Sequence, residues 1–99
     1  SFLEKKKYRN WKEKKKDCLR KIENVSKEAL IIVAVDKMVN LQSYFNALKE
    51  KGGKITKDFK GTPDEYRWFY TEVGNILASR LGKHPIVNDY AKIWRLYKR

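Results

Sequence analysis

Three polar side chains stand on one side of an apolar segment of this 99-residue chain. Asp36, Asn40 and Ser43 are spaced i, i+4 and i+7, and an α-helix places such positions on one face. The surrounding segment, 29–41, is largely apolar, which predicts a helix that is buried nearly all round. An ionised carboxylate in such a helix requires an ionic partner, hydrogen bonds or a bound metal. We therefore expect Asp36 to have a partner.

One interpretation of this polar stripe is structural. Asp36 would be a core carboxylate that bonds to a Lys or Arg of a neighbouring helix, while Asn40 and Ser43 fill nearby polar gaps. The other interpretation is a functional site. Spacing alone favours neither interpretation.

Two helices are expected in the first half of the chain. Residues 4–23 carry apolar side chains at helical spacing, although Lys15 interrupts their stripe. Ser26 can cap a second helix, which we expect from Lys27 to Lys51 and which carries the polar stripe. Cys18 lies on the apolar side of the first helix and is expected to be a buried, unreactive thiol.

Two more helices are expected in the second half. Thr62, Pro63 and Glu65 form the pattern of an N-cap, a first-turn proline and a capping box, so a third helix should run over 63–81. Pro85 can open a fourth helix. With no strand pattern and no second domain, residues 1–99 predict one all-α domain of about four helices in an orthogonal or irregular bundle. The expected core positions of the third helix are Tyr66, Phe69, Tyr70, Val73, Ile76, Leu77 and Leu81.

Five segments carry a further signal: Trp11–Lys15, Glu28–Lys37, Ala34–Asn40, Glu65–Tyr70 and His84-Pro85. In this order they resemble the carboxyl-terminal part of HD-type metal phosphohydrolases, in the RelA/SpoT-like branch that removes pyrophosphate from guanosine tetra- and pentaphosphate. Ala34–Asn40 is similar to the Ala-Asp-Lys/Arg-Leu-x-Asn segment of that branch. The likeness covers most of the chain and implies a partial HD-domain-like fold.

The resemblance implies roles for the three polar residues. Asp36 would be the fourth protein ligand of a divalent metal, usually manganese. Asn40 would contact the ribose or base region of a phosphorylated nucleotide, and Ser43 would stand where the family often has a Thr near the substrate. The chain departs from the family at Val39, where an aromatic residue or His is common.

A more serious departure is that the His and His-Asp metal ligands of the family are absent. The chain has one His, His84, one Cys, and no His-Asp dipeptide, and a divalent-metal site needs several ligands. We therefore expect no catalytic residue within this chain, no metal bound by it alone, and no activity. The chain would be the carboxyl-terminal half of a longer enzyme; the alternative is a degenerate relative kept for protein contacts.

Composition adds a binding alternative. The net charge is +12, and residues 1–23 carry ten Lys or Arg against four acids. A dense basic patch suits a nucleic acid, an acidic protein or a phosphorylated nucleotide, so a basic helical nucleic-acid- or protein-binding module is the second hypothesis. A solvated, lysine-rich helix face is the plainer explanation. An exposed apolar face could also support self-association.

Localisation follows from two further features. No run of 18 apolar residues exists, so no membrane span is expected. A single Cys fits a reducing cytoplasm.

Overall fold

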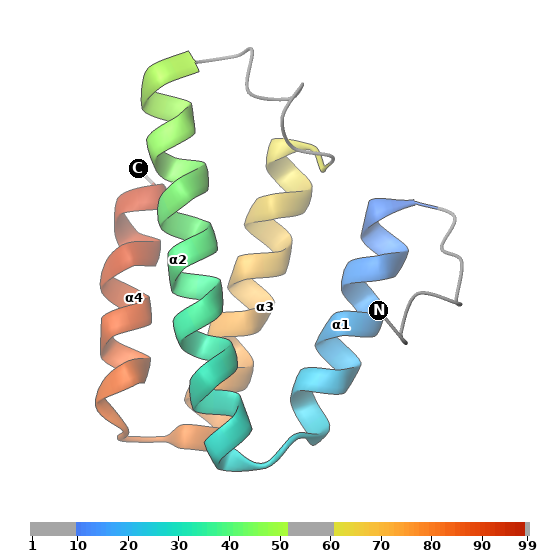
Figure 1. Cartoon of the computed structure of the whole chain (residues 1–99), viewed down its shortest axis with the longest axis vertical. Coiled ribbons are helices and arrows are strands. Elements are labelled where there is room, and N and C mark those ends of the chain that lie inside the picture. The colour runs from blue at the N-terminus through green and yellow to red at the C-terminus, as the bar shows by residue number, and fades with distance from the viewer. Residues whose placement is uncertain (1–9, 52–60, 99) are drawn as a thin grey trace.

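The computed structural model describes residues 10–51 and 61–98, and within these ranges every regular element is a helix (Figure 1). The all-α prediction is thereby confirmed. The elements are α1 (Trp11–Asn24), α2 (Lys27–Lys51), α3 (Pro63–Leu81) and α4 (Pro85–Lys98).

The first helix begins later than the sequence pattern suggested. Asn10 has an extended backbone, and its side-chain oxygen accepts a hydrogen bond of 2.9 Å from the backbone N–H of Glu13. This is N-cap geometry, in which the side chain satisfies a backbone donor that has no partner within the helix. The predicted start at residue 4 is therefore wrong for α1, and residues 4–9 lie outside the described residues.

The starts of the other helices follow their local sequence signals. The Ser26 hydroxyl accepts from the N–H of Ala29 at 3.1 Å, so it caps α2 as predicted. Thr62 and Glu65 form the complete capping box at the start of α3. His84 caps the start of α4, because its Nδ1 accepts a hydrogen bond of 3.0 Å from the backbone N–H of Ile86.

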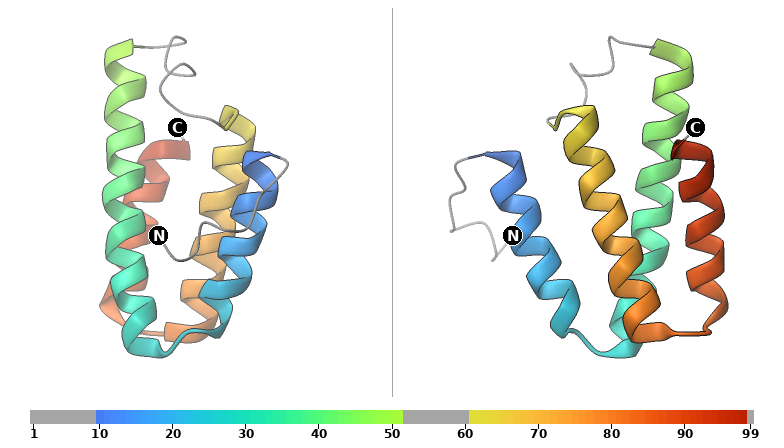
Figure 2. Two further views of the ribbon diagram at one scale, coloured as in Figure 1. Left: turned by 45° about the vertical axis from the view of Figure 1, so that its right-hand side comes forward. Right: turned by 180° about the vertical axis from the view of Figure 1, so that it is seen from behind.

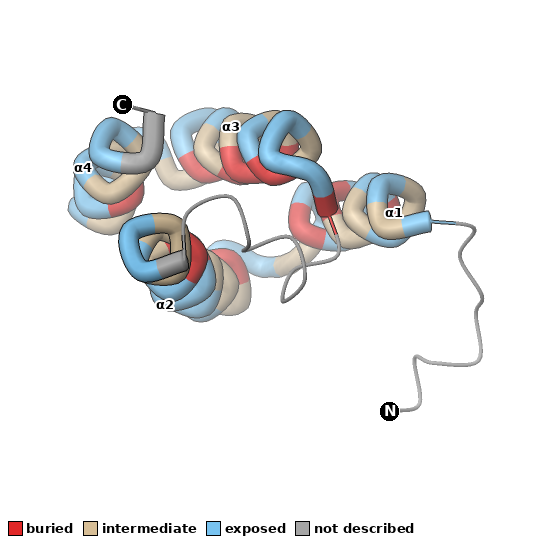
Figure 3. Tube along the Cα trace, turned by 90° about the horizontal axis from the view of Figure 1, so that it is seen from above, coloured by how far each residue is buried: buried red, intermediate tan, exposed pale blue. Residues whose placement is uncertain are grey.

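The helices form a layer of three, and the fourth helix lies along one side of this layer (Figures 1 and 3). Seen from above, α1, α3 and α4 follow one another in a row, with α3 between the other two (Figure 3). Helix α2 packs against α3 and α4 on one side of this row, whereas α1 packs against α3 (Figures 1 and 2). The strip beside α2, over the α1 and α3 end of the row, therefore has no covering helix among the described residues.

The core is strongly aromatic where α2 and α3 meet. Tyr66 of α3 stacks on Tyr44 of α2, with ring centroids 4.4 Å apart. Trp11 of α1 also contacts Tyr66, with ring centroids 4.7 Å apart. The predicted stripe of α3 is buried from Tyr66 to Leu77 and half-buried at Leu81. Most of the hydrophobic burial predicted from helical spacing is confirmed in this way. The buried members of α3 are Tyr66, Phe69, Tyr70, Val73, Ile76 and Leu77.

A glycine sets the distance between α3 and α4. A Cβ atom on Gly74 would lie 3.2 Å from Cε1 of Tyr90, which is closer than ordinary van der Waals contact. The missing side chain therefore lets the buried ring of Tyr90 rest directly on the backbone of α3.

Candidate functional site

The three residues of the polar stripe lie together on the surface of α2. Asp36, Asn40 and Ser43 are all exposed, and Asn40 Nδ2 donates a hydrogen bond of 3.3 Å to Asp36 Oδ2. Lys37 Nζ lies 3.7 Å from the same carboxylate oxygen. The second oxygen of Asp36 is thus available to a ligand, whereas no hydrogen bond joins Ser43 to either residue among the described side chains.

The prediction that α2 is buried nearly all round is wrong. The Asp36 side chain is 63% exposed, and Ile32 and Val39 are 71% and 59% exposed. The cause is the arrangement of the helices: α2 meets α3 and α4 on one side, and its opposite side meets no helix of the described chain. The argument that a buried carboxylate needs a partner therefore does not apply to Asp36 here.

A groove runs between α1 and α2, next to the stripe. Its volume is about 400 Å³. Both helices contribute to its walls, and Asp36 stands at its edge. The lining side chains are Cys18, Lys21, Ile22 and Val25 from α1 and Ile32, Val33, Asp36 and Lys37 from α2. Cys18 is half-buried in this wall, so the expectation of a buried thiol is corrected to a thiol at the edge of a groove.

Two lysines, one from α1 and one from α2, place their ammonium groups over the ring of Phe69. The ammonium group of Lys15, from α1, lies 4.9 Å from the centre of the Phe69 ring and 5.4 Å from that of Trp11. The ammonium of Lys37, from α2, lies 5.7 Å from the same Phe69 ring. Both ammonium groups therefore lie over the same aromatic ring, whose face attracts cations, and we call this ring the Phe69 floor.

The two lysines differ in their electrostatic surroundings. Burial, followed by the positive charge of Lys37, lowers the pKa of the Lys15 ammonium below its ordinary value of 10.5. Lys37 has Asp36 beside it, whereas Lys15 forms no ion pair within the described residues. An anion placed between the two lysines would lie against both ammonium groups.

Sequence reasoning missed both lysines as site residues. In the sequence, Lys15 interrupts the apolar stripe of the first helix, and Lys37 directly follows Asp36. A lysine at a core-facing helical position was the available signal, because a long side chain can lay its methylene groups on apolar surface while its charge reaches an opening.

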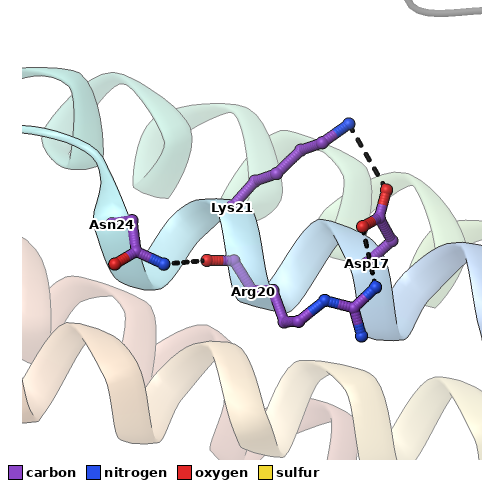
Figure 4. A network of polar contacts seen from close by, with 4 residues as sticks. All are labelled: Asp17, Arg20, Lys21 and Asn24. Carbon is purple, nitrogen blue, oxygen red and sulfur yellow. Dashed lines mark hydrogen bonds and ion pairs between the residues drawn. The ribbon is translucent and has the colours of Figure 1, made fainter.

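The wall of α1 is reinforced by a buried carboxylate. Asp17 is only 7% exposed, and its two oxygens contact Arg20 Nη2 at 2.8 Å and Lys21 Nζ at 3.4 Å (Figure 4). Asn24 continues the network by donating to the Arg20 carbonyl at 2.7 Å. These contacts hold Lys21 at the rim of the groove.

The described residues fit a metal site only in part. A carboxylate and an amide oxygen are suitable ligands for a divalent cation such as Mn²⁺. Asp36 and Asn40 offer such groups, but no three His, Cys, Asp or Glu side chains of the described chain gather closely enough to hold an ion. Any further ligands would have to come from outside the described residues.

Among the described residues, no helix is both long and apolar enough to cross a membrane.

Comparisons with known proteins identify no relative of this chain. A scan against protein-family models finds no match, and searches of curated proteins and of solved structures find no significant similarity.

Proposed function

We propose that this chain is the carboxyl-terminal part of an HD-type, metal-dependent phosphohydrolase domain that acts on guanosine tetra- or pentaphosphate. The observation that carries the proposal is the exposed pair of Asp36 and Asn40, one helical turn apart and joined by a 3.3 Å hydrogen bond. Both residues stand in the segment that resembles the family's Ala-Asp-Lys/Arg-Leu-x-Asn sequence.

The exposure of this pair is what a shared site requires. A carboxylate that contributes one ligand to a metal must be reachable by the ligands of other elements. Asp36 meets this requirement, because its side chain is 63% exposed.

Each residue of the stripe has a distinct task in this proposal. Asp36 would bind the metal through the oxygen that Asn40 does not contact. Asn40 would contact the ribose or base region of the nucleotide, and its hydrogen bond to Asp36 would orient the carboxylate, in the way that outer partners of metal ligands do. Ser43, about a turn further on, would contact the nucleotide. When bound, the divalent metal supplies Lewis-acid polarisation of a phosphate and an activated water.

The first test is the DNA sequence of the reading frame upstream of the Ser1 codon. The proposal expects codons for a His and for a His-Asp pair followed within about a turn by Glu-Asp. A start codon immediately before Ser1 would overturn it, because the described residues do not complete a metal site.

The second test is activity of the protein expressed from the whole reading frame. Release of pyrophosphate from guanosine tetraphosphate is measured with Mn²⁺ for the wild type, Asp36→Asn and Asp89→Asn. Asp89 is an exposed carboxylate on α4 and removes the same charge elsewhere. We expect Asp36→Asn to lower the rate by roughly 100-fold or more and Asp89→Asn by less than about twofold.

The fold provides the control for this comparison. Since the Asp36 side chain is 63% exposed, its replacement by Asn should leave the circular dichroism spectrum and the thermal midpoint unchanged. Undiminished hydrolysis by a folded Asp36→Asn protein would refute the assignment of Asp36.

A further inference from the structure

We propose that the groove between α1 and α2 is a docking site for an acidic amphipathic helix of a partner protein. This inference goes beyond the hydrolase proposal and does not depend on it, because the groove and its lysines do not require a metal. Three properties of the groove support it: its open shape, its apolar walls and its uncompensated positive charge.

The shape of the groove matches a helix. Helix α2 covers the α3 and α4 end of the three-helix row, and no other helix of the described residues lies over the strip beside it at the α1 and α3 end (Figure 3). A further helix in this strip would lie alongside α2 and contact both walls, because packed helices are separated by about 8–10 Å. A small molecule in so open a groove would keep much of its surface in water, whereas sites for small ligands usually enclose them.

The walls provide the apolar contacts that an amphipathic helix needs. Ile22 and Val25 face the groove from α1, and Ile32 and Val33 face it from α2. Ile32 is 71% exposed, and the exposed Val39 extends the apolar surface along α2. Helices bind in such grooves through apolar side chains that recur at helical spacing.

Charge selects an acidic occupant. Lys21 and Lys37 line the groove together with the carboxylate of Asp36, and the ammonium group of Lys15 lies over the same Phe69 ring as that of Lys37. Lys21 is already paired with Asp17, but Lys15 has no ion-pair partner in the described chain and Lys37 shares an exposed one. Carboxylates of a docked helix would meet these two lysines on the Phe69 floor, where contact with opposite charge is favourable.

The same charge argues against a second copy of this chain as the occupant. Each copy carries a formal net charge of +12, so association of two copies would bring like charges together. The acidic helix is therefore the occupant that fits both the walls and the charge.

The experiment uses the whole 99-residue chain and a fluorescent synthetic peptide of about 18 residues, which makes about five helical turns. The probe has Leu at i, i+3, i+4 and i+7 and Glu beside this stripe. A control peptide has Gln in place of every Glu. Fluorescence anisotropy should show binding of the Glu peptide that is about tenfold or more tighter than that of the Gln peptide. Equal binding of the two peptides, or no binding of either, overturns the proposal.

Matched protein variants locate the contact. Lys15→Gln combined with Lys37→Gln should weaken binding of the Glu peptide about tenfold or more. Lys83→Gln combined with Lys92→Gln removes the same charge from exposed positions outside the groove and should weaken it less than about twofold. Equal losses in the two double variants would show an effect of net charge alone and would refute a specific groove.

Two further measurements use the groove residues directly. Cys18, the chain's single thiol, lines the groove, so bound Glu peptide should slow its reaction with a thiol reagent about tenfold. Asp36→Asn removes the one carboxylate from the wall and should tighten the Glu peptide, although it abolishes hydrolysis in the other proposal. Failure of one proposal is thus distinguishable from failure of the other. Displacement of the peptide by a 20-base-pair DNA duplex that itself loses binding in the Lys15 and Lys37 variant would instead identify a nucleic-acid surface.

Discussion

The hydroxyl group of Tyr90 on α4 donates a hydrogen bond of 2.6 Å to the backbone carbonyl oxygen of Tyr70 on α3. Both rings are buried, at 2% and 5% exposure, so this bond forms inside the contact between the two helices. Burial raises the pKa of both phenols, with the neighbouring tyrosines as a further cause. The bond and the raised pKa values together keep this part of the interior neutral.

Removal of the Tyr90 hydroxyl should destabilise the bundle moderately. We expect Tyr90→Phe to lower the free energy of unfolding by about 1 kcal/mol, the usual net value of one buried hydrogen bond. Urea denaturation followed by circular dichroism measures the change. The control is Thr71→Val, which removes a hydroxyl that bonds to the Arg67 carbonyl at the surface and should change stability by less than about 0.5 kcal/mol. Equal effects of the two variants would contradict the assigned burial.

The close approach at Gly74 predicts a larger effect. Gly74→Val would push methyl groups into the ring of Tyr90, which already lies 3.2 Å from the position of a Cβ atom. Overpacking of this kind costs about 1–3 kcal/mol and should also disturb the Tyr90 hydrogen bond. The control is Ser79→Val on the exposed face of α3, with an expected change of less than about 0.5 kcal/mol. A thermal midpoint of Gly74→Val equal to that of the wild type would show that α4 can retreat from α3.

The pH dependence of stability should reveal the penalty of burying the ammonium group of Lys15. Because its pKa is lowered in the folded state, the unfolded chain binds more protons between that lowered pKa and 10.5. The penalty of burying the ammonium is thus fully present below the folded pKa and disappears as the pH rises to 10.5. Lys15→Met should therefore be more stable than the wild type at pH 7, and the difference should shrink as the pH is raised.

The tyrosines act in the opposite direction over the same range. Their folded pKa values lie above the ordinary 10.0, so the stability that they contribute is present below pH 10 and is lost above it. This contribution is common to the wild type and Lys15→Met and cancels when the two are compared at each pH. A stability difference that stays constant from pH 7 to pH 10.5 would argue against a lowered pKa of Lys15.

The buried carboxylate of Asp17 gives a salt-dependent prediction. Asp17→Asn keeps the shape of the side chain but weakens the contacts to Arg20 and Lys21, whose side chains are 64% and 57% exposed. We expect a loss of about 0.5–1 kcal/mol at low salt, which decreases at 1 M salt as screening weakens the ion pairs in the wild type. The comparison is Asp64→Asn, because Asp64 is 94% exposed and lies 3.9 Å from Arg67. It also loses a first-turn carboxylate of α3, so we expect a cost of less than about 0.5 kcal/mol. Identical losses for the two variants at both salt concentrations would be inconsistent with this account.

Local sequence signals predicted the helices well because their physical cause is local. The capping box of Thr62 and Glu65 and the cap at Ser26 form within one turn and do not depend on distant residues. The stripe of α3 was also predictable, because this helix lies in the middle of the row and is surrounded by neighbours. The start of α1 differs from the apolar spacing because the Asn10 side chain caps the helix at that point, and this cap has no counterpart in the apolar pattern.

The environment of Asp36 could not be predicted in the same way. The stripe of Asp36, Asn40 and Ser43 is a property of helical spacing, and the structure places all three on one exposed face. Whether that face is covered depends on how α1 packs, and apolar residues such as Ile32 give no sign that their side remains open. The lysine pair of Lys15 and Lys37 likewise joins two helices and has no signature in either sequence segment alone.

The attachment of α1 determines how this molecule opens. Helix α1 packs against α3 and is joined to α2 by Val25 and Ser26, while α2, α3 and α4 pack against one another. We expect α1 to detach as a unit at lower free energy than global unfolding, so its amide hydrogens should exchange with solvent before those of α3. Detachment of α1 would expose the surface of α3 that it covers, so limited proteolysis should cleave in or beside α1 before it cleaves in α3.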